Sequence, residues 1–240
     1  MRFSLFDAFI KEETPTEFIM DKLPKIEVYR IPEVEHFSQR DNVYDPYINC
    51  FPTSTSMGIN YCLEIKGLDK TVIGCDPKVQ IEDYVNQIMI DSSTTKWMKS
   101  NFGRSWWGWR YRRQTIAIVN EYIFNLLMNR HGYKANFTTQ LSYDQYCATI
   151  FKTKLPIIMS GNFSSVSRIK GHICCGVGFN RIGLEELIVH DPYGSALKSY
   201  PKGQSLEENS EDGTYVQYSK KFFIKSKNPE LMWGLIISKQ

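Results

Sequence analysis

The chain has 240 residues, of which 42% are hydrophobic and 14% aromatic. This composition supports a packed core and excludes a disordered chain, and the length fits one large domain or a domain with a sizeable insertion. The formal net charge of +3 does not indicate a nucleic-acid binder, although it permits contact with an anionic surface.

The N-terminal sequence "MRFSLFDAFIKEE" carries acidic residues early and lacks the apolar core of a signal peptide. No run approaches the roughly 18 apolar residues that a membrane-spanning helix needs. We therefore expect synthesis in the cytoplasm and no stable insertion into a membrane. If the target lies outside the cell, another component, such as a partner pore, must deliver the protein there.

Six cysteines are spaced irregularly, at Cys50, Cys62, Cys75, Cys147, Cys174 and Cys175. They form no CxxC pair, so the sequence predicts reduced thiols and no zinc ribbon. We also expect no other metal site and no cofactor. The adjacent Cys174 and Cys175 are expected to point to opposite faces of a strand and to pack there, with no further role that the sequence assigns.

Residues 1–37 are predicted to form an N-terminal extension, and residues 38–240 a single main domain. In the extension, prolines interrupt alternating apolar residues, a pattern typical of a turn followed by one or two short edge strands. Two alternatives stay open: the extension is a pro-segment that covers a functional groove, or it is part of the fold.

A helix is predicted from Cys50 onward, because Met57, Tyr61 and Ile65 recur at helical spacing on one face. Three further helices are predicted at residues 80–92, 112–133 and 142–153. Gly132 is expected to end the third of these four helices, and Ser142 to cap the start of the fourth.

After residue 153 the apolar pattern changes from helical to strand spacing. Short apolar runs bounded by Gly, Pro and Asn predict three consecutive strands at residues 154–163, 171–180 and 185–194. An acidic segment at 205–213 is predicted to be a loop, and residues 214–223 and 231–239 to be further strands or a strand and a tail. Helices that precede strands indicate an α+β fold.

Cys50 stands where the first helix is expected to begin. The partial positive charge of a helix N-terminus stabilises a thiolate, so this residue is either a nucleophile or a small buried side chain. Among the four histidines, His172 follows Gly171 at the start of an apolar strand, and this glycine leaves room for a substrate backbone. Asp191 ends the next strand, from where it can hold the imidazole.

Gln39 lies upstream of the cysteine and carries an amide that can donate to a developing oxyanion, together with the backbone N–H of Cys50. Cys50, His172, Asp191 and Gln39 are therefore our candidate catalytic residues.

This arrangement resembles the bacteriocin-processing (double-glycine leader) peptidases among the papain-like cysteine peptidases, especially the stand-alone branch found in phage and bacterial cell-wall lytic proteins. The resemblance covers roughly residues 33–200. The residues that carry it are Gln39-Arg40-Asp41-Asn42, Cys50-x-x-Thr53-Ser54-x-x-Met57, Pro156-Ile157-Ile158, Gly171-His172 … Gly176-x-Gly178-Phe179 and His190-Asp191-Pro192-Tyr193-Gly194. It implies a papain-like fold, with Cys50 as nucleophile, His172 as general base and acid, Asp191 orienting the imidazole and Gln39 in the oxyanion hole.

Substrate contacts are predicted at Phe51, Trp106, Trp107 and Gly171. Relatives usually have Gly directly after the cysteine, whereas this chain has Phe51, which we expect to narrow the groove. The segment "GRSWWGWRYRR" (103–113) has two interpretations: its Trp and Arg side chains stack on sugar or peptide and contact an anionic polymer, or the Trp residues belong to the core.

Three functions fit the sequence. The first is hydrolysis of the stem or cross-bridge peptides of peptidoglycan, as in a phage endolysin. The second is a cytoplasmic protease or leader peptidase that acts on a protein substrate. The third is an inactive binding module, against which the complete set of Cys, His and Asp argues. The sequence names neither the scissile bond nor the oligomeric state.

Overall fold

The computed structural model describes residues 26–43, 49–91, 113–163, 165, 171–195, 213–225 and 228–240. The predicted substrate contacts at Trp106 and Trp107 lie outside these ranges, as do residues 205–212 of the predicted acidic loop. The motif residues that carry the family resemblance and the four candidate catalytic residues all fall within them.

One antiparallel sheet dominates the described part of the chain. Its strands follow the order β2-β8-β3-β4-β5-β6, while β1 pairs with β4 and β7 pairs with β8. The strands are β1 (Val28–Arg30), β2 (Tyr133–Ser142), β3 (Ile157–Gly161), β4 (His172–Asn180), β5 (Glu186–His190), β6 (Val216–Ser219), β7 (Ile224–Lys225) and β8 (Asn228–Lys239).

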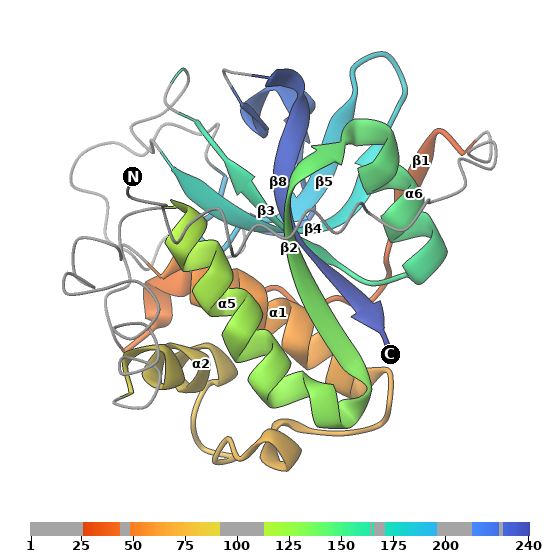
Figure 1. Cartoon of the computed structure of the whole chain (residues 1–240). Helices are drawn as coiled ribbons and strands as arrows, with labels where there is room; N and C mark the ends of the chain where they lie inside the picture. Colours follow the sequence, from red (N-terminus) through yellow and green to blue (C-terminus); the bar gives the residue numbers. More distant parts are fainter. Residues whose placement is uncertain are drawn as a thin grey trace, which may run out of the picture.

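Helices cover both faces of this sheet. The α-helices are α1 (Cys50–Glu64), α2 (Ile81–Ile90), α5 (Arg113–Met128) and α6 (Tyr143–Thr153), with short 3₁₀ turns at η1 (Gln39–Asp41), η2 (Lys70–Ile73), η3 (Asn129–His131) and η5 (Lys220–Phe222). In Figure 1, α1, α2 and α5 gather on one side of the sheet, away from α6. No helix in the described ranges is both long and apolar enough to cross a membrane.

Close packing fixes α1 and α6 on opposite faces. A Cβ added to Gly58 of α1 would lie 2.8 Å from Ile237, so the helix approaches the sheet closely at this glycine. On the other face, a Cβ on Gly176 of β4 would lie 2.7 Å from the hydroxyl oxygen of Tyr146 in α6. Larger residues at either position would push a helix off the sheet, because protein interiors leave no spare volume.

The predicted helices are all present, with small differences at their ends. Ser142 caps α6 through a capping box with Gln145, whereas α5 ends at Met128 and Gly132, left-handed at φ 77°, ends the η3 turn that follows it. Of the three residues expected on one face of α1, Met57 and Tyr61 are buried, but Ile65 lies just beyond the helix and is 44% exposed. That part of the prediction was wrong because the helix ends one residue earlier.

The three consecutive strands are confirmed as β3, β4 and β5, which are neighbours in the sheet. The prediction that all helices precede the strands was only partly right, because β1 and β2 come before α6 in the chain. β2 was missed: it pairs with β8 at an edge of the sheet, about 100 residues away in the chain, and its polar residues hide the alternation.

The described end of the predicted extension packs against the sheet. β1 pairs with the C-terminal half of β4, and the backbone N–H of Ile31 donates to the carbonyl of Val177 at 2.8 Å. Ile31 and Val34 are buried in the core. Residues 26–37 thus lead directly into the loop that carries Gln39.

Candidate active site

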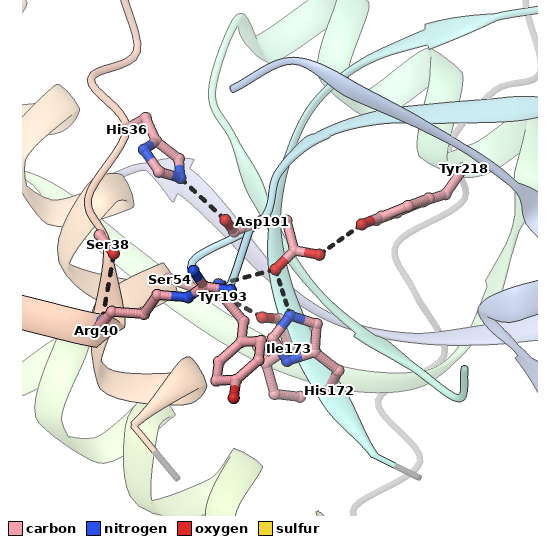
Figure 2. A network of polar contacts seen from close by, with 9 residues as sticks. All are labelled: His36, Ser38, Arg40, Ser54, His172, Ile173, Asp191, Tyr193 and Tyr218. Carbon is pink, nitrogen blue, oxygen red and sulfur yellow. Dashed lines mark hydrogen bonds and ion pairs between the residues drawn. The ribbon is translucent and has the colours of Figure 1, made fainter. Parts of the chain in front are cut away.

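The start of β4 and the end of β5 meet, because the two strands are antiparallel neighbours. His172 is the first residue of β4, and Asp191 directly follows β5. Their side chains point toward each other in Figure 2, and His172 Nε2 lies 2.5 Å from Asp191 Oδ1. Both residues are buried, with 3% and 0% exposed. Since a carboxylate oxygen accepts hydrogen bonds, His172 Nε2 carries the proton that is donated to Asp191. The other ring nitrogen, Nδ1, can then exchange a proton with another group.

Several groups hold the Asp191 carboxylate in place. Oδ1 also accepts the backbone N–H of Tyr193 at 2.9 Å, and Oδ2 accepts the hydroxyl of Tyr218 at 2.5 Å. His36 Nε2 donates to the backbone carbonyl of Asp191 at 2.9 Å. The carboxylate is therefore fixed by donors on both oxygens, which orients the His172 ring that it faces.

The surroundings of His172 favour its protonated form. Burial by itself lowers the pKa of this imidazole, but the Asp191 carboxylate and the Cys174 thiol outweigh it and hold the pKa well above its usual value. The rings of Phe163 and Tyr193 stand edge-on to the imidazole, with centroids at 6.0 and 6.3 Å. They enclose the hydrogen bond between imidazole and carboxylate in an apolar frame, where it is stronger than in water.

Cys50 is the first residue of α1 and is partly exposed. One turn later, the hydroxyl of Ser54 donates to the carbonyl of Ile173 at 3.1 Å, which ties the start of α1 to the residue after His172. Burial raises the pKa of Cys174 to about 12, and the nearby charges that act on it include those of His172 and Cys50. The start of α1 and the start of β4 therefore belong to one site.

Gln39 reaches the same site through the η1 turn. Its backbone N–H donates to the carbonyl of Pro192 at 2.8 Å, next to Asp191. Asn42, which ends the turn, donates its side-chain amide to Thr53 Oγ1 in the first turn of α1 at 3.0 Å. The loop is thus fastened both to the end of β5 and to the start of α1, and the structure brings the four candidate catalytic residues to one region.

The predicted substrate contacts fare differently. Gly171 is exposed directly before β4, beside His172. Phe51 is 5% exposed and packs in the hydrophobic core, so its expected effect on the groove stays a prediction.

Sequence reasoning missed Tyr218 and His36 as parts of this site. Tyr218 lies in a segment predicted as a strand, but no local signal says that its hydroxyl faces Asp191. The sequence assigns no role to His36 in the predicted extension; in the structure it is half-buried and its ring donates to the backbone carbonyl of Asp191.

A cysteine at a helix start, a buried pair of imidazole and carboxylate on neighbouring strands, and an amide-bearing loop together have the composition of a thiol hydrolase site. No curated protein matches the chain. A solved structure of UfSP from C. elegans is similar, with 12% identity and a TM-score of 0.31, over 51% of this chain and 22% of that one. A TM-score this low does not establish a shared fold.

The family comparison is decisive. The sequence model of the Peptidase_C39 like family matches residues 31–221, which is most of the chain. The match begins at the buried Ile31 and ends in the η5 turn after β6, so it includes the whole site and the strands that carry it. The chain belongs to the Peptidase_C39 like family and is a papain-like cysteine peptidase with an α+β fold.

Proposed function

We propose that Cys50, His172, Asp191 and Gln39 perform the catalysis, and that the peptide bond they cleave lies in the stem or cross-bridge peptides of peptidoglycan. The observation that carries the catalytic assignment is the hydrogen bond between His172 Nε2 and Asp191 Oδ1, beside the helix that begins at Cys50. It leaves Nδ1 of the imidazole as the nitrogen that exchanges a proton with the thiol.

In the proposed mechanism, His172 takes the proton of Cys50, and the thiolate is stabilised by the imidazolium and by the positive end of α1. The sulfur attacks the scissile carbonyl carbon. The oxyanion that forms accepts hydrogen bonds from the Gln39 amide and the Cys50 backbone N–H.

Collapse of this intermediate releases the amine, which takes its proton from the His172 imidazolium. A water molecule then gives a proton to the imidazole and attacks the thioester, which frees the acid and restores the thiol. Asp191 keeps its negative charge throughout and holds the ring in one tautomer, as the contacts of both carboxylate oxygens allow.

The substrate assignment rests on the resemblance to stand-alone wall-lytic peptidases. The formal charge of +3 is compatible with an anionic wall polymer. In this proposal the enzyme is made in the cytoplasm and released to the wall through a partner pore.

Zymography on purified cell walls tests the proposal. Wild-type protein is expected to clear the wall, whereas Cys50→Ala is not. Cys62→Ala is the matched control, because Cys62 is a buried thiol of the same helix. Mass spectrometry of the soluble products then identifies the new amine and carboxyl ends. Wild-type inactivity on several wall types would remove peptidoglycan as the substrate.

A protein substrate is the second candidate, because the matching family is a peptidase family whose description names no wall activity. The third function from the sequence, an inactive module, is distinguished by a thiol-reactive probe. An active peptidase labels at Cys50 faster than at Cys62, whereas equal labelling supports inactivity.

A further inference from the structure

A second thiol lies beside the proposed catalytic pair. His172 and Cys174 are two residues apart on β4, so their side chains share one face of the strand, and Asp191 reaches this face from the end of β5. One donor atom from each residue lies within 4.8 Å of the other two, and all three residues are buried. The catalytic assignment explains His172 and Asp191, but it gives Cys174 no step of the reaction beyond its share in raising the pKa of His172.

We propose that His172, Cys174 and Asp191 form an inhibitory site for Zn²⁺. Nitrogen, thiolate sulfur and carboxylate oxygen are the three donors that zinc prefers in proteins. The sequence did not predict this site, because its ligands come as His-x-Cys on one strand and a single Asp on the next, without a CxxC pair.

The distances fit a coordination shell after a small movement. With the usual zinc bond lengths, two ligands of one tetrahedral ion lie about 3.4–3.6 Å apart, and the three donor atoms here already lie within 4.8 Å of one another. Either Cys50, at the partly exposed start of α1, or a water molecule can supply the fourth ligand.

The charges also balance. Zinc displaces two protons, that of the Cys174 thiol and the one on His172 Nε2, and both go to solvent. The neutral imidazole keeps its proton on Nδ1, and the thiolate and the Asp191 carboxylate together neutralise the ion. A buried ion needs such pairing, because an uncompensated charge in this environment is costly. Tyr218 and Tyr193, which donate to the two Asp191 oxygens, hold the carboxylate as outer partners of the site.

Zinc binding and catalysis exclude each other at this site. In the free enzyme His172 Nε2 and Asp191 Oδ1 are 2.5 Å apart, whereas two ligands of one zinc ion stand about 3.4 Å apart. The ion therefore opens this hydrogen bond, and a His172 ring that binds zinc through Nε2 keeps its proton on Nδ1, where the proposed reaction needs a lone pair. The inhibition rests on the proposed catalytic function, but the binding does not.

Binding is tested in the inactive Cys50→Ala protein, so that the result is independent of any substrate. Zn²⁺ titrated in a calorimeter is expected to bind once per chain, and Co²⁺ in the same protein is expected to give a thiolate-to-cobalt charge-transfer band. Adding Cys174→Ala should weaken binding about 100-fold and remove the band. Adding Cys175→Ala is the matched control, because Cys175 is equally buried on the opposite face of β4 and should change neither.

A cobalt complex of Cys50→Ala without a thiolate band would overturn the proposal, as would equal zinc affinities of the two double variants. Thermal unfolding checks that both fold, and Cys174→Ser replaces the alanine variant if that one does not. In active wild-type protein, Zn²⁺ should inhibit hydrolysis reversibly, with recovery on chelation, and inhibition of Cys174→Ala should need about 100-fold more metal. Absence of any wall activity would contradict the proposed function and leave the binding result standing.

Discussion

Two histidines, both buried and placed at the ends of neighbouring strands, have opposite environments. His172 at the start of β4 faces the carboxylate of Asp191, and its pKa is held well above the usual value. His190 at the end of β5 faces backbone groups: Nε2 donates to the carbonyl of Val34 at 2.8 Å, and Nδ1 accepts the N–H of Tyr215 at 3.2 Å. Burial, with weaker effects of nearby positive groups, lowers its pKa to about 3.

The difference shows that burial does not decide what a histidine does here. Both rings lie away from water, so the partner of the second nitrogen decides the protonation state. A carboxylate makes His172 a cation that can exchange a proton with a thiol. A backbone N–H that needs a lone pair keeps His190 neutral, since protonation of Nδ1 would break that hydrogen bond. The environment of His172 allows proton transfer, whereas the two hydrogen bonds of His190 connect the backbones of Val34 and Tyr215.

The largest expected difference is in kcat/KM between the variants in which His172 or His190 is replaced by glutamine. We expect His172→Gln to lower kcat/KM by about 10⁴-fold, because it removes the proposed general base and acid. His190→Gln should stay within about tenfold of wild type, since Gln also offers one donor and one acceptor. Steady-state kinetics on the substrate that the wall assay identifies will measure both. If the His190 variant proves as inactive as the His172 variant, the division of roles is wrong.

Removal of the charge that distinguishes the two histidines is the next largest effect. Asp191→Asn should lower the pKa of His172 and reduce kcat/KM about 100-fold at neutral pH. The sign follows from the active form: the thiolate–imidazolium pair survives only up to the imidazolium pKa, so the alkaline limb of the pH–rate profile should move to lower pH. A profile that only drops, without this shift, would show that Asp191 acts through packing and not through its charge.

Local signals let the sequence predict much of this site. Cys50 stands at a helix start, His172 follows a glycine at the start of an apolar strand, and Asp191 ends the next strand. The contact between imidazole and carboxylate then follows from antiparallel pairing of consecutive strands, a common arrangement. The capping box of Ser142 is equally local, and α6 was predicted within one residue of its observed start.

What the sequence did not predict depends on the register of distant strands. Tyr218 meets Asp191 because Val189 pairs with Val216 across β5 and β6, and no pattern within either segment specifies that pairing. β2 likewise exists through β8, its partner near the C-terminus. The position of Cys174 on the His172 face could have been inferred from alternation, but its distance to Asp191 could not.

The neutral state of His190 predicts a loss of stability in acid. A group whose pKa falls on folding binds fewer protons when folded, so its contribution is complete above the unfolded pKa of about 6.5 and is lost as the pH falls toward 3. Between pH 7 and pH 5 the free energy of unfolding should fall by about 2 kcal/mol on this account. Urea unfolding at the two pH values measures it, with His190→Gln expected to lose less.

Two comparisons isolate this effect. Glu82 acts in the opposite direction, since burial raises its pKa to about 7 and its protonation favours folding. The difference between wild type and His190→Gln cancels that contribution. His131→Gln gives the weaker counterpart: burial and the nearby cations Arg130 and Lys66 also lower the pKa of His131, but this ring is only half-buried, so its replacement should change the pH dependence of stability less than His190→Gln does. Equal pH dependence of wild type and His190→Gln would contradict the assignment.

The smallest expected effect concerns Tyr218, which we interpret as a positioning residue for Asp191. Tyr218→Phe removes the donor to Oδ2, and the loss of a hydrogen bond to a buried charge should cost about 1.5 kcal/mol of stability. Because the carboxylate loses one of its restraints, kcat should fall about tenfold with little change in KM.

Tyr146→Phe is the matched control for Tyr218→Phe: the hydroxyl of Tyr146 donates to the carbonyl of Gly178 at 2.8 Å, on the α6 side of the sheet. Both variants should lose stability, but only Tyr218→Phe should lose kcat, since only its hydroxyl touches the residue that orients His172. If kcat falls equally in both, the tyrosine beside Asp191 supports the fold alone.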